Sequence, residues 1–186
     1  MKSKFFAPRF LFITIAILLA AMSRVLPHPF NFTPIAAMAL FGGALFTDKG
    51  IAFIIPLLAM ILSDLLLELI AGIGWHNTII YVYASFVLIT CIGIYIRNNA
   101  RTGNIILASL ISSILFFLIT NGGVWAASGF QFGFGGLLTT LLAGIPFYNN
   151  EIFGSFFFNT IVGDLFYCGI LFGSFYFARL KFPALA

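Results

Sequence analysis

Four ionisable side chains lie within apolar stretches of this sequence, namely Arg24, Asp64, Glu68 and Asp164. An ionisable group in such a setting is costly to bury, so it usually serves ligand binding, proton transfer or an ion pair. Asp64 and Glu68 are four residues apart and share one face of a helix. We expect Arg24 to pair with Asp64, either within a ligand site or as an ion pair that fixes helix register. For Asp164 we favour a structural role that braces neighbouring helices.

The only two histidines, His28 and His76, fall in short turns between apolar stretches. Polar and aromatic residues near them form a candidate pocket rim: Trp75, Tyr81, Tyr83, Asn121 and Trp125. The alternative is that the histidines are simply solvated and that the Trp and Tyr side chains line a membrane interface. A neutral imidazole of His76 can ligate a metal. No carboxylate and histidine spacing supports a structural zinc site, so any metal would arrive with a bound ligand.

The elements that must position these residues are membrane helices. The chain is 62% hydrophobic and only 8% charged, whereas a soluble domain carries roughly 25% charged residues. We therefore expect an all-α integral membrane protein, a single transmembrane domain over residues 1–186. Stretches of about the length needed to cross a bilayer predict six transmembrane helices: 9–26, 33–46, 51–71, 78–96, 104–120 and 152–178.

Basic residues fix the expected topology. Eight of the nine lie at alternate ends of successive apolar stretches: Lys2, Lys4, Arg9, Lys49, Arg97, Arg101, Arg179 and Lys181. Because Lys and Arg concentrate in cytoplasmic loops, both the N and C termini should be cytoplasmic. The polar and aromatic candidates then collect on the outer side. The basic residues are dispersed and form no stripe, which argues against nucleic-acid binding.

The region 121–151 is expected to be irregular and to lie on the outer side. It is rich in Gly and Phe between residues 129 and 136, and we expect 121–136 to form a mobile cover over a bound ligand. Within it, the apolar segment 137–145 is too short to span a bilayer, so it is predicted to be re-entrant or interfacial.

Catalytic motifs are absent from the sequence. There is no His-Glu-x-x-His zinc motif and no Gly-x-Ser-x-Gly nucleophile turn, so an enzyme is the less favoured class. There is also no ATP-binding motif, and an ATP-driven step would need another protein. We expect no intrinsic cofactor.

A family resemblance runs through most of the chain. It rests on the block from Ser23 to Ala44 and on shorter matches at Ser63-Asp64-Leu65, Trp75-His76-Asn77-Thr78 with Tyr81, Gly144-Ile145-Pro146-Phe147, Asn159-Thr160, Gly163-Asp164-Leu165-Phe166-Tyr167 and Leu171-Phe172-Gly173. The sequence resembles small bacterial inner-membrane proteins related to the S components of energy-coupling-factor (ECF) vitamin transporters. That group includes the BtuM-type solitary cobalamin transporters.

The resemblance implies an S-component-like fold of six helices with a ligand cavity open to the outer side. In the cobalamin-transporting members, positions matching His28, Asp64 and Tyr81 resemble ligand-cavity positions. His76 or its neighbour Asn77 lies where those members offer a ligand to the cobalt of a corrinoid, although this chain lacks a cysteine there, which would be the stronger indicator. Ala16-x-x-x-Ala20 is similar to the motif that docks the ECF coupling subunit, which works with ATPases.

The function expected from these observations is uptake of a vitamin-like solute, with cobalamin or a related corrinoid as the candidate. The expected ligand-binding residues are His28, Asp64, His76, Tyr81, Arg24, Trp75 and Asn121, with His76 as the axial cobalt ligand. Three alternatives remain open. They are a proton-coupled carrier of a small metabolite with Asp64 or Glu68 as the proton site, a membrane-embedded enzyme acting on a lipid or on the ligand, and a non-transporting assembly subunit.

Overall fold

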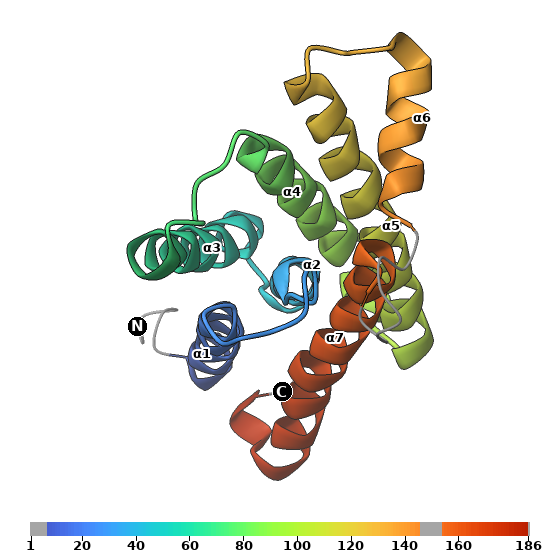
Figure 1. The fold of residues 1–186 in the computed structure, drawn as a ribbon. Helices are drawn as coiled ribbons and strands as arrows, with labels where there is room; N and C mark the ends of the chain where they lie inside the picture. Colours follow the sequence, from blue (N-terminus) through green and yellow to red (C-terminus); the bar gives the residue numbers. More distant parts are fainter. Residues whose placement is uncertain (1–6, 146–153, 186) are drawn as a thin grey trace.

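The chain folds into a bundle of helices. The computed structural model describes residues 7–145 and 154–185, and that part of the chain contains no strand. The helices run in the order α1 (Pro8–Ser23), α2 (Ile35–Leu45), α3 (Lys49–Ala71), α4 (Ile79–Ile96), α5 (Thr102–Ala127), α6 (Gly133–Ala143) and α7 (Phe156–Lys181), as Figure 1 shows. Short 3-10 turns follow α4 and α7, at Arg97–Asn99 and Pro183–Leu185. The predicted all-α class is confirmed.

Four helices are long and apolar enough to cross a membrane: Lys49–Ala71, Ile79–Asn99, Thr102–Ala127 and Phe156–Lys181. The expected first and second spans are shorter, because α1 has 16 residues and α2 has 11. At 1.5 Å per residue α2 is only about 16 Å long, roughly half the thickness of the hydrocarbon core. The chain is therefore membrane-embedded, with four full-length candidate spans, and the number of six spans stays a prediction.

The short helix α2 forms the centre of the bundle. All of its residues are buried, and longer helices surround it in the end-on view of Figure 1. Glycines allow this close packing: a Cβ on Gly42 would lie 2.5 Å from Cγ of Pro56 in α3, and one on Gly43 would lie 2.9 Å from Cα of Gly93 in α4. Small residues of this kind let helix backbones approach closely inside a bilayer.

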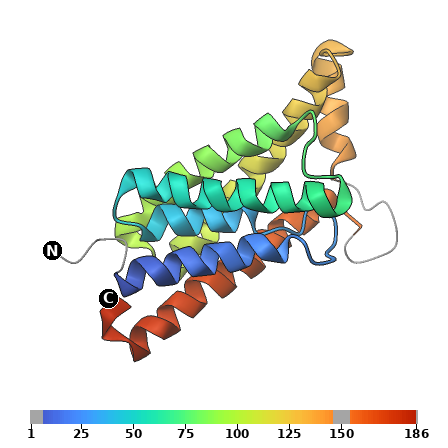
Figure 2. The same ribbon diagram turned by 90° about the vertical axis from the view of Figure 1, so that its left-hand side faces the viewer.

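The two ends of the bundle differ in sequence. Figure 2 shows that α1 begins and α7 ends at the same end of the molecule, where the α2–α3 turn and the α4–α5 connection also lie. The basic residues of these segments are therefore gathered at one end, which we call the basic end: Arg9, Lys49, Arg97, Arg101, Arg179 and Lys181. Both ends of the described chain lie on one side of the bundle, as the charge pattern predicted.

The expected end of the fifth span at residue 120 is wrong, because α5 continues to Ala127. The sequence Asn121-Gly122-Gly123 reads as a helix terminator, but tertiary packing keeps it helical. Asn121 Nδ2 donates to the carbonyl oxygen of Phe117 at 2.8 Å, and Gly123 lies so close to Tyr81 that a Cβ there would be 2.9 Å from the tyrosine Cβ. The chain turns only at Gly129, where φ is +75°.

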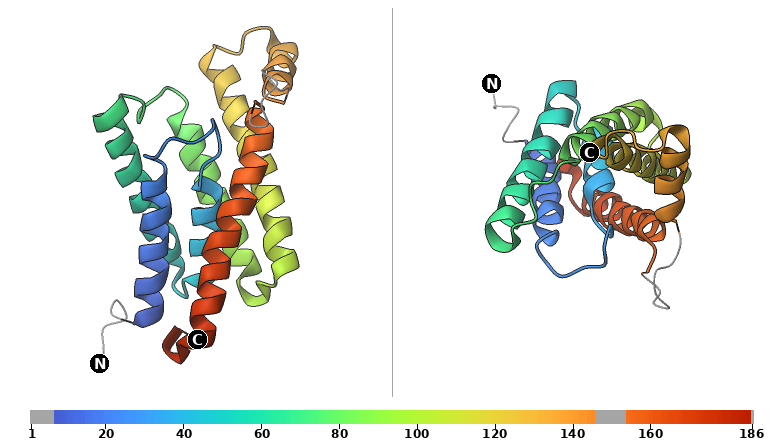
Figure 3. Two further views of the ribbon diagram at one scale, coloured as in Figure 1. Left: turned by 60° about the horizontal axis from the view of Figure 1, so that its bottom comes forward. Right: turned by 45° about the horizontal axis from the view of Figure 1, so that its top comes forward.

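The Gly/Phe segment is an ordered helical hairpin rather than an irregular cover. Residues 133–143 form α6, which packs along the end of α5 (Figure 3, left). In the connection, Trp125 Nε1 donates to the carbonyl oxygen of Gln131 at 3.2 Å, and the rings of Trp125 and Phe130 meet edge to face at 4.8 Å. The segment 137–145 was expected to be short and non-spanning. Most of it lies in this 11-residue helix, and residues 146–151 of the expected irregular region lie outside the described residues.

Candidate ligand-binding cavity

A cavity of about 730 Å³ opens at the end of the bundle opposite the basic end. Its walls come from the α1–α2 loop, the second half of α3, the α3–α4 loop, the start of α4, the end of α5, α6 and the start of α7. The volume lies within the roughly 300–1,000 Å³ of typical small-molecule sites. Four of the expected site residues lie at this lining together with Asp64: Arg24, His28, His76 and Asn121.

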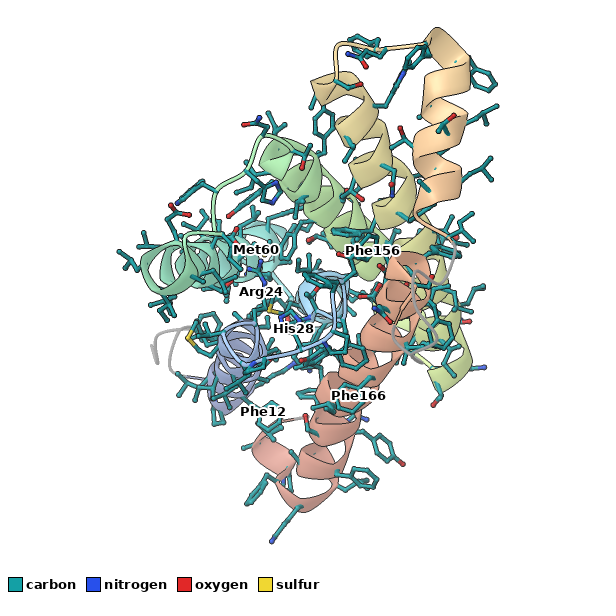
Figure 4. The ribbon with its side chains drawn as sticks, in the orientation of Figure 1. Phe12, Arg24, His28, Met60, Phe156 and Phe166 are labelled. Atoms are coloured by element: carbon teal, nitrogen blue, oxygen red, sulfur yellow. The ribbon has the colours of Figure 1, made fainter. Side chains whose placement is uncertain are left out.

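The expected pair between Arg24 and Asp64 is confirmed. Arg24 Nη1 lies 2.6 Å from Asp64 Oδ1, and the Asp64 side chain is only 3% exposed. The same nitrogen contacts Ser63 Oγ and lies 3.3 Å from the sulfur of Met60, which Figure 4 shows beside it. Tyr83 donates its hydroxyl to Asp64 Oδ2 at 2.7 Å. The carboxylate thus ties α1, α3 and α4 together, and both of its oxygens are occupied.

Arg24 retains unused hydrogen-bonding capacity. Its Nε is buried and has no hydrogen-bond partner among the described residues. A buried donor without a partner is destabilising, and a ligand acceptor would remove that cost. Arg24 itself lines the cavity, so its guanidinium group places a positive charge beside the open space.

His28 and His76 use their ring nitrogens differently. His28 Nδ1 lies 3.0 Å from the Pro29 carbonyl oxygen, and Nε2 lies 3.2 Å from that of Arg24, so both nitrogens face the backbone. In His76, Nδ1 lies 2.9 Å from Thr78 Oγ1, and Nε2 has no partner among the residues that the structure describes. If Nδ1–H donates to Thr78, the lone pair of Nε2 is free, which is the arrangement that metal-ligating histidines adopt. His76 is therefore the better placed of the two to ligate a metal.

Two of the expected site residues are not at the cavity lining. Trp75 is 53% exposed, and its backbone N–H donates to Glu68 Oε2 at 3.1 Å. Tyr81 turns its ring onto Gly123 of α5 and serves helix packing. Both residues border the elements that carry the cavity, but neither side chain is part of its wall.

Glu68 fixes the loop that carries His76. Its Oε2 accepts from the backbone N–H groups of Gly74 and Trp75 at 3.0 and 3.1 Å. Gly72 ends α3 in the left-handed region with φ +66°, and a Cβ on Gly74 would lie 2.7 Å from the Glu68 nitrogen. Glu68 is thus a loop-bracing residue, which leaves less reason to regard it as a proton site.

Several wall residues were not expected from the sequence. They include three threonines that add hydroxyl groups: Thr120, Thr139 and Thr140. Tyr83 was expected at the rim; it does not line the cavity but donates its hydroxyl to Asp64, which does. Tyr83 lies 19 residues from Asp64 on the next helix, so the sequence gives no local signal for their contact. The threonines stand in apolar helices, where their hydroxyls bond backbone oxygens one turn earlier.

Asp164 lies away from this cavity and has the bracing role that was favoured for it. Ser113 Oγ of α5 lies 2.6 Å from Asp164 Oδ2 of α7, and both side chains are buried. A few residues earlier on α7, Asn159 Nδ2 donates to the carbonyl oxygen of Phe30 at 2.7 Å. These contacts tie α7 to α5 and to the α1–α2 loop. Among the described residues, no group of three His, Cys, Asp or Glu side chains could hold a metal ion.

Residues 4–185 match a family described as "Family of unknown function (DUF6580)". The match covers nearly the whole chain, so the protein belongs to this family. No curated protein matches the chain, and no solved structure does.

Proposed function

We propose that this protein binds a vitamin-like solute in the 730 Å³ cavity and takes it up across a bacterial inner membrane, in the manner of an S component. The observation that carries the proposal is a cavity open at one end of a membrane-embedded bundle, with the Arg24–Asp64 ion pair among its lining residues. Cobalamin or a related corrinoid is the first solute to test. The basic end would face the cytoplasm, which leaves the cavity open to the outside.

Each polar wall residue has a distinct role in this proposal. Arg24, held by Asp64, would donate to an acceptor on the solute, such as an amide or carboxylate oxygen. Asn121 keeps its carbonyl oxygen near the end of α6 while its amide nitrogen bonds Phe117. His76, exposed at the mouth, would offer Nε2 to cobalt while Thr78 orients the ring.

The position of His76 suits a bulky solute. A corrinoid is larger than the drug-sized molecules that cavities of this volume enclose. It would therefore enter in part and leave its cobalt near the mouth, where His76 lies. Helix tilting would then open a path inward, and α6, which contributes Thr139, Thr140 and Ala143 to the wall, is the helix best placed to move.

The energy source would come from a partner or from the solute gradient. The small-residue motif in α1 gives no support for docking an ECF coupling subunit, because Ala20 is buried in the bundle and Ala16 packs against its core. A coupling subunit and its ATPases would have to use another surface, or the protein works alone.

Equilibrium dialysis of labelled cobalamin against the detergent-purified protein tests the proposal. Ala143→Trp would fill the cavity from α6 and should abolish binding. The matched control is Leu142→Trp on the neighbouring position, which is 63% exposed and absent from the wall, and it should bind normally. If both variants bind like the wild type, the cavity is not the binding site. Uptake that stops when the proton gradient collapses would favour the proton-coupled carrier, and product formation in detergent would favour an enzyme.

A further inference from the structure

A second cavity, of about 950 Å³, lies at the basic end. Its walls come from the end of α2, the α4–α5 connection, the start of α5 and the second half of α7, and four arginines line it: Arg9, Arg97, Arg101 and Arg179. None of the lining residues is acidic. Within 7–145 and 154–185 the only ion pair is Arg24–Asp64, at the opposite end of the bundle.

Two of these arginines bind the carboxyl end of α2. Arg97 donates from Nε and Nη2 to the Gly43 carbonyl oxygen at 3.2 and 3.0 Å, and from Nη1 to that of Thr47 at 2.8 Å. Arg9 donates from Nη2 to the Leu45 carbonyl oxygen at 3.2 Å. Cations at a helix C-terminus complement its partial negative charge. This interaction accounts for the presence of Arg9 and Arg97. The partial negative charge of the helix end offsets only a fraction of the charge of these two arginines.

The remaining donors face no partner. The side chains of Arg101 and Arg179 make no hydrogen bond or ion pair to any described residue, and Arg9 Nε is buried without a partner among them. The positive charges of Arg179 and Arg97 also repel the positive charge of Arg9. Four cations around one hollow at a membrane boundary repel one another, so an anion placed among them would be strongly favoured.

The rest of the cavity is apolar and continues onto the lipid-facing surface. Ile105 and Ile106 of α5 face Leu165 and Phe172 of α7 across it, and Ile106 is also 47% exposed. On α7, Gly169 and Gly173 lie in open space, since a Cβ at either position would meet nothing within 4 Å. The cavity therefore has a positively charged part, lined by arginines, and an apolar part that runs between α5 and α7.

We propose that the cavity at the basic end binds one anionic phospholipid. The phosphate of this lipid lies between Arg101 and Arg179, with Arg9 behind them. One of its acyl chains lies between α5 and α7, along Gly169 and Gly173. Basic pockets between transmembrane helices recognise anionic headgroups in this way, and each arginine near the surface contributes about 1 kcal/mol. A free phosphate would use the arginines but would leave the apolar channel empty.

The test measures lipid retained by the detergent-purified protein after incubation with phosphatidylglycerol or with phosphatidylcholine, by native mass spectrometry. Wild type should keep one phosphatidylglycerol and no phosphatidylcholine. Arg101→Gln with Arg179→Gln should weaken retention about thirty-fold. The matched control is Lys49→Gln with Lys181→Gln, two basic residues at the same end that do not line the cavity, and it should behave like wild type.

A third variant separates the lipid from a free anion. Gly173→Leu fills the apolar channel without changing charge and suits a helix, so the protein should fold, lose phosphatidylglycerol and still bind inorganic phosphate. If Gly173→Leu keeps the lipid, or if inorganic phosphate displaces it fully from wild type, the ligand is a small anion and the lipid proposal is wrong. Equal retention of phosphatidylcholine would likewise overturn it. Unchanged thermal unfolding shows that each variant is folded.

Discussion

The two cavities of this bundle balance their charges in opposite ways. At the cavity opposite the basic end, which we call the outer cavity after its proposed orientation, Arg24 Nη1 lies 2.6 Å from Asp64 Oδ1, and Tyr83 donates to the second carboxylate oxygen. At the basic end, four arginines surround a hollow whose described walls contain no acid. The short helix α2 runs from one to the other, with Ile35 in the first wall and Leu45 in the second.

The difference shows what each cavity can accept. A site that supplies its own counter-ion is close to neutral and can bind a polar solute that must later be released. A site with uncompensated cations needs an anion to be stable in a membrane, and it keeps that anion as part of the structure. The first arrangement suits a transported solute and the second suits a resident lipid.

The largest effect should come from breaking the charge balance at the outer cavity. Asp64→Leu leaves the Arg24 guanidinium without its counter-ion and should lower the free energy of unfolding by about 3–5 kcal/mol. The double replacement Arg24→Met with Asp64→Leu should recover most of that loss, because apolar residues often replace a buried ion pair at little cost. Denaturant unfolding in detergent measures all three proteins.

The matching change at the basic end should have little effect. Arg101→Met removes a cation that has no acidic partner, so the free energy of unfolding of the lipid-free protein should change by less than about 0.5 kcal/mol. If Arg101→Met is as damaging as Asp64→Leu, or if the double replacement is no more stable than Asp64→Leu alone, the contrast between the two cavities fails.

Tyr83→Phe tests whether the hydroxyl contributes to that balance. It removes one hydrogen bond to a charged group and should cost about 1.5–3 kcal/mol by the same unfolding measurement. Tyr95→Phe is the control, since its ring is highly exposed and makes no hydrogen bond to the described residues. Equal stability of the two variants would mean that Arg24 alone stabilises the Asp64 carboxylate and that the Tyr83 hydroxyl adds nothing.

Gly43→Ala tests α2 as the rigid element between the cavities. The added methyl group would meet the Thr90 backbone oxygen and lie 2.9 Å from Cα of Gly93, so α2 and α4 must separate. Overpacking of this kind costs about 1–3 kcal/mol. Gly103→Ala, where a Cβ meets nothing within 4 Å, is the control and should be neutral or stabilising. A tolerated Gly43→Ala would show that α2 is not tightly held.

The smallest expected effect concerns the orientation of His76. Thr78→Val keeps the shape of the side chain but removes the hydroxyl that bonds Nδ1. Removing such an outer partner lowers metal affinity by about tenfold, and it should leave stability unchanged because Thr78 makes no capping hydrogen bond to α4. Cobalamin titration measures the change. An unaltered affinity for cobalamin would show that Thr78 does not orient His76 for cobalt binding.

The sequence predicted the Arg24–Asp64 pair because each charge stands in an apolar stretch and needs a partner at a similar depth. It also placed the basic residues at one end. It could not predict Tyr83, since the direction in which α4 faces depends on the burial of α2 between the other helices. Asn121 and the glycines after it looked like a helix end, yet contacts with Tyr81 and Phe117 extend α5. Local propensity is overridden where helices pack this closely.

The visible absorption spectrum tests most directly whether the outer cavity holds a corrinoid near His76. The protein would be purified in detergent from cells grown with cobalamin. We expect a corrinoid band that travels with the protein and weakens in His76→Ala. A colourless protein that also binds no added cobalamin would contradict the corrinoid assignment, and a band unchanged in His76→Ala would remove His76 from the site.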